Sequence, residues 1–299
     1  MQNFIVFVCF LFLYSSPSMA QNTLKITNGS TIKVKNGASI VIKDGKFVNN
    51  GTFEAGDGTV KIKGTSSDAN STIEGSSTTT FNNLTIDKSS NNVQLQQSIE
   101  VKGTLDLQSG HLDLQNHQAI IQNTGTTSNA SANSYVKTSG TGTLQQEVGN
   151  GAVLFPVGNT AYNPATLNNT GGTTDDYQIR VADNRLQDGT TGTAINDSSV
   201  RQTWMVTETN TGGTNLEMKL QWNRNEESAT FNRNQAYITH YESGTWDTHP
   251  PMAAAGLTPY TLTRTAIQSL SPFSVASMPM NPDVPTMGEW SLLNLALLL

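Results

Sequence analysis

Cysteine is almost absent from this chain of 299 residues, which has a single one, Cys9. A disulfide framework is therefore excluded, and the fold must depend on its core and its backbone hydrogen bonds. Charged residues are also few, at 13%, which excludes long tails that stay disordered through charge and poor hydrophobicity. A net charge of −6 and a pI near 5.2 give no basic footprint, so no nucleic-acid partner is expected.

Motifs for catalysis and cofactor binding are lacking as well. The sequence has no G-x-S-x-G nucleophile elbow and no glycine-rich phosphate loop. Its histidines are better explained as surface or strand residues than as metal ligands, although the first two lie six residues apart: His111, His117, His240 and His249. We predict no catalytic residue, no metal and no cofactor.

The residues that are abundant instead are Asn, Thr, Ser and Gly, which favour turns and strands over helices. They predict an all-β chain. Its charges divide it in two: residues 21–137 have ten Lys and no Arg, whereas residues 138–299 have one Lys, six Arg and all four Trp. This change of usage predicts two domains, at residues 21–134 and 135–277.

The N-terminus has the pattern of a signal peptide. Residues 4–14 are almost wholly apolar, and Ser18-Met19-Ala20 is the small-x-small pattern that signal peptidase reads. The apolar run is too short for a stable membrane anchor. We expect a signal helix within residues 1–20 and cleavage between Ala20 and Gln21; a buried strand is the alternative. Cys9 would leave with the signal.

The C-terminus has a proline-rich linker and a short apolar tail, residues 278–299. The tail resembles the IPTL-type C-terminal sorting signal of exported Gram-negative proteins, which has an I/V-P-T-L/M-x-x-W box, an apolar helix and closing arginines. Here the helix is short and the arginines are absent, which indicates a truncated copy; a disordered apolar end is the alternative. The box is formed by Val284, Pro285, Thr286, Met287 and Trp290.

Short alternating segments separated by tight turns fill the first domain. Apolar pairs at i, i+2 place both side chains on one face of a strand, and Asn-Gly and Asp-Gly supply the turns. Strands this short and this close predict a β-solenoid of four or five coils between residues 22 and 125. The pairs are Leu24/Ile26, Ile32/Val34, Ile40/Ile42, Val60/Ile62, Leu84/Ile86, Val93/Leu95, Ile99/Val101, Leu105/Leu107 and Leu112/Leu114.

Lysines occupy outward positions of these strands. They could form a stripe that binds anionic polysaccharide, but the interspersed acids favour the simpler interpretation that they keep the surface soluble and protect strand edges. They are Lys33, Lys35, Lys43, Lys61 and Lys63.

Longer strands with strict alternation mark the second domain, for example Leu216, Met218, Leu220 and Trp222 with polar residues between them. At least six such strands without a convincing helix predict an antiparallel β-sandwich. Most aromatic residues should lie in its core. Trp246, beside a turn glycine, and Tyr241 are the candidates for glycan contact.

The order of motifs over nearly the whole mature chain resembles a group of exported, repeat-bearing surface proteins of Gram-negative bacteria. The resemblance rests on seven segments: FNNLTI at 81–86, VKGTLDL at 101–107, LFPVG at 154–158, YNP at 162–164, RQTW at 201–204, LQWN at 220–223 and SPFSV at 271–275. It implies a cell-surface or secreted, adhesin-like role and brings no catalytic motif.

We therefore expect a non-enzymatic structural or adhesin-like protein at the cell surface or outside the cell. Its partners would be a surface glycan or matrix polymer and the export and sorting machinery, with membrane contact only through the signal and the sorting tail. A carbohydrate-binding module is the alternative, and a polysaccharide-degrading β-helix enzyme is less favoured. Asp175-Asp176 and Glu226-Glu227 are adjacent, so the members of each pair should face opposite ways rather than converge on a sugar.

Overall fold

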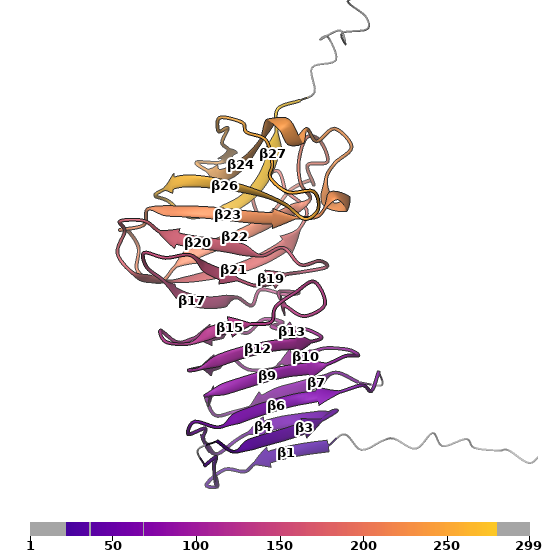
Figure 1. Cartoon of the computed structure of the whole chain (residues 1–299), viewed down its shortest axis with the longest axis vertical. Helices are drawn as coiled ribbons and strands as arrows, with labels where there is room; N and C mark the ends of the chain where they lie inside the picture. The colour runs from indigo at the N-terminus through magenta and orange to yellow at the C-terminus, as the bar shows by residue number, and fades with distance from the viewer. Residues whose placement is uncertain (1–21, 36, 68, 280–299) are drawn as a thin grey trace, which may run out of the picture.

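The protein is described by a computed structural model, which covers residues 22–35, 37–67 and 69–279. The predicted signal peptide and sorting box lie outside these residues. The chain is all-β, and the described helices are two 3₁₀ turns, Arg224–Glu226 and Arg233–Gln235. Within these ranges the chain forms no helix with the length and hydropathy that a bilayer crossing requires. The molecule is elongated, with short stacked strands at one end and longer antiparallel strands at the other (Figure 1).

The N-terminal part is a β-solenoid in which each turn contributes three strands. About six turns are present. The first two are β1 (Asn22–Ile26), β2 (Thr31–Lys33), β3 (Ser39–Lys43), and β4 (Gly45–Asn49), β5 (Thr52–Glu54), β6 (Thr59–Gly64). The third and fourth are β7 (Ser71–Gly75), β8 (Thr79–Phe81), β9 (Asn83–Lys88), and β10 (Val93–Leu95), β11 (Ile99–Val101), β12 (Thr104–Ser109). The fifth and sixth are β13 (Leu112–Asp113), β14 (Ala119–Ile121), β15 (Thr126–Ser128), and β16 (Val136–Lys137), β17 (Leu144–Val148), β18 (Val153–Phe155).

Equivalent strands of successive turns pair in parallel, so the sheets run along the long axis of the molecule. One turn takes 26 residues where Lys46 faces Thr72 and 19 where Val93 faces Leu112. The predicted β-solenoid is thus confirmed. Four or five coils between residues 22 and 125 correspond to about 20–25 residues for each coil, which is close to the observed spacing. Turns one to five end at Ser128, close to the end expected from the sequence.

The parallel ladders run on past residue 134. β16 pairs with β13, β17 pairs with β14, and β19 (Val157–Gly158) pairs with β16, all in parallel. This accounts for a sixth turn beyond the predicted range of four or five coils. β16 and β19 have two residues each, too few for a periodic signal. β17 has five, but Gln146 occupies the inward position between Leu144 and Val148, so no apolar pair at i, i+2 is present.

The apolar pairs of the sequence point inward, as their spacing predicts. Ile62, Leu84, Ile86 and Leu105 have no exposed surface, and the paired residues of the later turns are at most 1% exposed. Nearer the N-terminus the core is aromatic: Phe47, Phe53 and Phe81 meet edge to face, with ring centroids 5.1 to 5.7 Å apart. These inward side chains form one continuous cluster along the solenoid.

A buried ion pair links three turns of the solenoid. The side chain of Lys88, at the end of β9, has no exposed surface, and its Nζ lies 2.8 Å from Asp44 Oδ1 and 3.0 Å from the backbone oxygen of Ser66. Asp44 has a φ of +49°. A Cβ on Gly64 would lie 1.9 Å from Asp44 Oδ1, so only glycine leaves room for this carboxylate.

The C-terminal part consists of longer antiparallel strands. Its remaining strands are β20 (Ala165–Asn169), β21 (Asp175–Asp183), β22 (Gln202–Glu208), β23 (Leu216–Trp222), β24 (Ala236–Glu242), β25 (Thr245–Trp246), β26 (Tyr260–Ile267) and β27 (Pro272–Ser277). One sheet has the order β18-β20-β23-β26. The predicted alternation of β23 is confirmed: Leu216, Met218, Leu220 and Trp222 are fully buried.

A second, nine-stranded sheet passes from one part of the molecule into the other. Its order is β25-β24-β27-β22-β21-β17-β14-β11-β8. β17 is the strand where the pairing changes, since it is parallel to β14 on one edge and antiparallel to β21 on the other. The hydrophobic cores of the two parts belong to one cluster. Backbone hydrogen bonds and apolar packing therefore both continue across this junction.

Candidate functional site

Two of the five predicted outward lysines, Lys33 and Lys61, form ion pairs with carboxylates of the adjacent turn. Lys33 Nζ lies 2.8 Å from Glu54 Oε2, directly across the β2–β5 ladder. Lys61 Nζ lies 2.8 Å from Asp87 Oδ2 and also donates to Gln108 Oε1 at 3.0 Å. Lys43 and Lys63, in contrast, face each other across the β3–β6 ladder, and Lys63 faces Asp87 across the β6–β9 ladder. The ion pairs of Lys33 and Lys61 agree with the expected role in solubility and edge protection. A stripe that binds anionic polysaccharide stays the alternative prediction.

Trp246 and Tyr241, the two residues predicted to contact a glycan, lie together on the β24–β25 hairpin. Their rings meet edge to face with centroids 5.4 Å apart. The guanidinium carbon of Arg185 lies 4.7 Å from the centroid of Trp246, and the indole N–H donates to the oxygen of Leu186 at 2.8 Å. Gly189 packs so closely on Tyr241 that a Cβ there would lie 2.7 Å from the ring. Both rings are half-buried.

These contacts attach the loop after β21 to the hairpin. Arg185 is itself buried, and burial lowers the pKa of its guanidinium. Arg185 Nε has no hydrogen-bond partner in the part of the chain that the structure describes. The face of Trp246 and the nearby carboxylate of Asp247 both stabilise its charge. A glycan could reach the exposed edges of the two rings, whereas the ring faces against Arg185 and Gly189 are already covered. Glycan contact at this position remains a prediction.

A polar cleft that the sequence did not indicate lies elsewhere in the antiparallel part. It has a volume of about 430 Å³, and its walls include Thr160, Asp183, Arg201, Gln202 and Glu226. Asp183 accepts hydrogen bonds from Asn159 Nδ2 at 3.1 Å and from Thr160 Oγ1 at 3.0 Å. Gln202 is 3% exposed, and its Oε1 has no partner. Carboxylates, amides and a guanidinium are the groups that bind sugar hydroxyls by hydrogen bonding.

Glu226 is the buried carboxylate of this cleft. Burial raises its pKa, and hydrogen bonds from the backbone and side chain of Asn223 and from Asn163 act in the opposite direction. Asn163 Nδ2 donates to both of its oxygens, at 3.0 and 2.8 Å, and Asn223 N donates at 2.5 Å. These donors occupy the carboxylate, so it closes a 3₁₀ turn and fixes the loop that contains Asn163.

The adjacent carboxylate, Glu227, points to a different place. Its Oε1 accepts hydrogen bonds from Trp222 Nε1 at 2.9 Å and from Arg233 Nε at 2.8 Å. Glu226 and Glu227 therefore engage separate sets of partners, as their adjacency in the sequence predicts. This pair does not have the arrangement of two carboxyl groups facing one glycosidic bond.

The histidines also lie in separate environments. His111 packs against Tyr135 with ring centroids 4.0 Å apart and the ring planes tilted by 45°. His240 stacks on Phe273 at 4.3 Å and contacts Ser271 Oγ. Burial lowers the pKa of both imidazoles. In the residues that the structure describes, no group of three or more His, Cys, Asp or Glu side chains could hold a metal ion.

The polar cleft was missed because its residues are far apart in the sequence and belong to no motif. Thr160, Asp183, Arg201 and Glu226 come together only through the pairing of β21 with β22 and the hydrogen bond between Arg201 N and Glu226 O.

Comparisons with protein-family models, curated proteins and solved structures found no match for this chain. The fold defines it as a β-solenoid protein with an antiparallel C-terminal part.

Proposed function

We propose that this chain is a non-enzymatic, exported structural protein of the adhesin-like kind, acting at the cell surface or outside the cell. The solenoid would be a stalk, and the antiparallel part, which we interpret as a β-sandwich, would be the unit it presents. The proposed export rests on residues 1–20 and 284–290, which lie outside the described residues.

The observation that carries this proposal is the nine-stranded sheet that joins both parts. A stalk must transmit force to the unit at its end without a flexible joint. Here the β17–β21 ladder and a shared hydrophobic core connect the two parts, so parting them requires breaking a row of backbone hydrogen bonds and exposing apolar surface. This continuity supports a mechanical role.

Protease shaving of intact cells that express the full chain tests the location. Release of fragments from the described range by external protease, with a cytoplasmic control protein left intact, is the expected result. Full protection of the chain in whole cells, with cleavage after lysis, would contradict a surface location.

Carbohydrate binding is the second candidate, favoured by the polar cleft and by the unpartnered Oε1 of Gln202. A glycan array probed with the purified chain distinguishes the candidates. Saturable binding to one glycan class that Arg201→Ala abolishes would place the ligand in the cleft. Binding lost in Trp246→Ala but not in Arg201→Ala would place it at the hairpin. Release of shortened glycans would support an enzyme instead.

A further inference from the structure

Among the residues that the structure describes, two strand edges have no partner where the solenoid meets the antiparallel part. In turns one to five the third strands stack into one parallel sheet, β3-β6-β9-β12-β15, which ends at β15. β18 is the corresponding strand of the sixth turn, but it pairs antiparallel with β20 and is the terminal strand of that sheet. The third ladder of the solenoid is thus interrupted between β15 and β18.

The backbone groups at these edges can be identified residue by residue. Thr126 N donates to Gly103 O at 2.8 Å, on the β12 side. Because the hydrogen-bonding groups of successive strand residues point to opposite edges, Thr127 directs its N–H and C=O to the free edge. On β18 the carbonyl of Leu154 points away from β20, since it accepts a hydrogen bond from Gln146 Nε2 at 2.8 Å. The Leu154 N–H lies on the same side.

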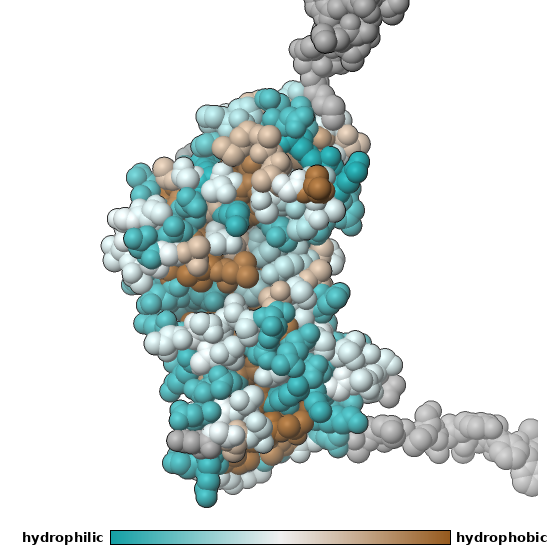
Figure 2. Space-filling model, viewed as in Figure 1, coloured by the Kyte–Doolittle hydropathy of each residue, from teal (hydrophilic) through white to brown (hydrophobic). Residues whose placement is uncertain are grey.

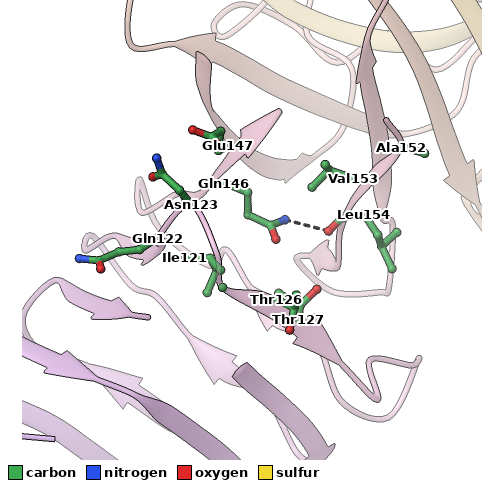
Figure 3. A pocket seen from close by; sticks show the side chains of 11 residues that line it. Ile121, Gln122, Asn123, Thr126, Thr127, Gln146, Glu147, Ala152, Val153 and Leu154 are labelled. Atoms are coloured by element: carbon green, nitrogen blue, oxygen red, sulfur yellow. Dashed lines mark hydrogen bonds between the residues drawn. The ribbon is translucent and has the colours of Figure 1, made fainter. Parts of the chain in front are cut away.

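A hollow of about 310 Å³ lies between the two edges. In Figure 3 the Gln146 side chain reaches from β17 towards β18, and Thr126 and Thr127 line the hollow from β15. Its apolar wall includes Ile121, Val153 and Leu154, and Leu154 is 42% exposed. Figure 2 shows an apolar patch at the level where the two parts of the molecule meet. The hollow therefore combines free backbone groups with an apolar wall.

We propose that this hollow binds an extended peptide segment of a partner protein by β-strand addition. The N–H and C=O of Thr127 and the N–H of Leu154 are groups that an added strand satisfies, and a peptide N–H would replace Gln146 Nε2 at the Leu154 carbonyl. Side chains on alternate residues of that strand find an apolar wall on one side. The hydrogen bond from Gln146 to Leu154 marks a position that a peptide N–H would occupy.

Charge specifies the peptide further. Glu147 stands at the rim of the hollow, and Asp176 faces it across the β17–β21 ladder. The residues that line the hollow include no Lys or Arg. A segment that alternates apolar and basic residues therefore fits best, with its apolar residues against Leu154 and its basic residues towards Glu147.

Residues 59–65 of this chain, TVKIKGT, supply a probe of that chemistry. In the protein most of this segment forms β6 of the same parallel sheet, with Val60 and Ile62 buried and Lys63 exposed. We would titrate a labelled, end-blocked peptide of this sequence with the full chain and follow its fluorescence anisotropy. Saturable binding that weakens with added salt is expected, and absence of binding to this peptide would overturn the proposal.

Thr127→Pro removes the free N–H without breaking the β12 ladder, since proline is tolerated at an outward N–H of an edge strand. It should weaken binding about three- to tenfold, the loss of one hydrogen bond. Thr127→Val keeps the N–H and should bind like the unmodified protein. Equal affinity of both variants would contradict strand addition. An unchanged far-UV circular dichroism spectrum checks that Thr127→Pro is folded.

Two further measurements leave the protein unaltered. The same peptide with both lysines replaced by glutamate should bind more weakly, and the same peptide with alternate backbone nitrogens methylated should not bind; equal binding of either contradicts the proposal. Sedimentation of the full chain tests the other occupant. A dimer that dissociates in Thr127→Pro would mean that a second copy of this chain fills the hollow, which would overturn a peptide partner.

Discussion

Removing the charge of Asp44 should destabilise the solenoid through Lys88. The Lys88 side chain has no exposed surface and has Asp44 as its ion-pair partner at 2.8 Å. Asp44→Asn keeps the size of the side chain, and asparagine tolerates the positive φ at this position. The variant therefore leaves a buried ammonium with a neutral acceptor in place of a carboxylate.

The expected magnitude follows from the burial of the two partners. Breaking a buried ion pair by removing one charge costs about 3–5 kcal/mol. The Asp44 side chain keeps 20% exposure, and the asparagine oxygen can still accept a hydrogen bond, so we expect about 2–3 kcal/mol. Urea unfolding should show a lower midpoint with little change in slope. Hydrogen exchange should quicken first in β3, β6 and β9, because solenoid turns depend on their neighbours.

The pH dependence gives an independent check on the same pair. The hydrogen bond from Lys88 lowers the pKa of Asp44 in the folded protein. The stabilisation is therefore present above the ordinary pKa of an aspartate, about 3.9, and is lost as pH falls through the lower folded value. The difference between the unmodified protein and Asp44→Asn should persist at pH 5–7 and shrink below about pH 4.

Lys88→Met provides the matched control, since an apolar side chain of similar length needs no counter-charge. Added to Asp44→Asn, it should recover most of the lost free energy of unfolding. If Asp44→Asn unfolds at the same urea concentration as the unmodified protein, or if Lys88→Met worsens it, the ion pair does not stabilise the solenoid and the reasoning fails.

Three further predictions concern other parts of the fold. Gly64→Ala should displace the Asp44 carboxylate from Lys88, because the added Cβ would overlap Asp44 Oδ1. It should lower the melting temperature several times more than Gly29→Ala, where no atom lies within 4 Å of the added Cβ. Equal shifts of the melting temperature would refute this prediction. Trp204→Ala should cost about 3–5 kcal/mol in chemical denaturation, because it empties a fully buried site and leaves Asn163 O without the indole donor at 2.9 Å. Burial lowers the pKa of His240 and His111. The stabilisation of the folded state by the neutral imidazoles should therefore be present above the ordinary imidazole pKa of about 6.5 and be lost as pH falls towards the folded pKa values. A free energy of unfolding that does not decrease between pH 7 and pH 5 would contradict this prediction.

Period-2 spacing made the solenoid predictable, because each inward pair is a local signal. Where the pair is missing, the strand was missed: β5 has only Phe53 as an apolar residue, and β8 only Phe81. The burial of Lys88 was beyond local reasoning, since its partner Asp44 lies two turns earlier in the chain. Trp246, the candidate for glycan contact beside a turn glycine, is half-buried because Arg185 and Leu186 come from a loop about 60 residues away.

The way the solenoid ends accounts for the position of the free edges. The last strand of a parallel ladder presents unpaired N–H and C=O groups, which proteins often cover with another segment. The nine-stranded sheet is continued by β21 on β17, and the first ladder ends at β19, where Asn163 N donates to Val157 O at 3.0 Å and Gly158 bridges to Tyr162. In the third ladder the strand that would cover β15 is β18, and it pairs with β20 instead. The antiparallel part thus covers two of the three ladder ends, and the hollow beside β15 is the consequence of the third ending uncovered.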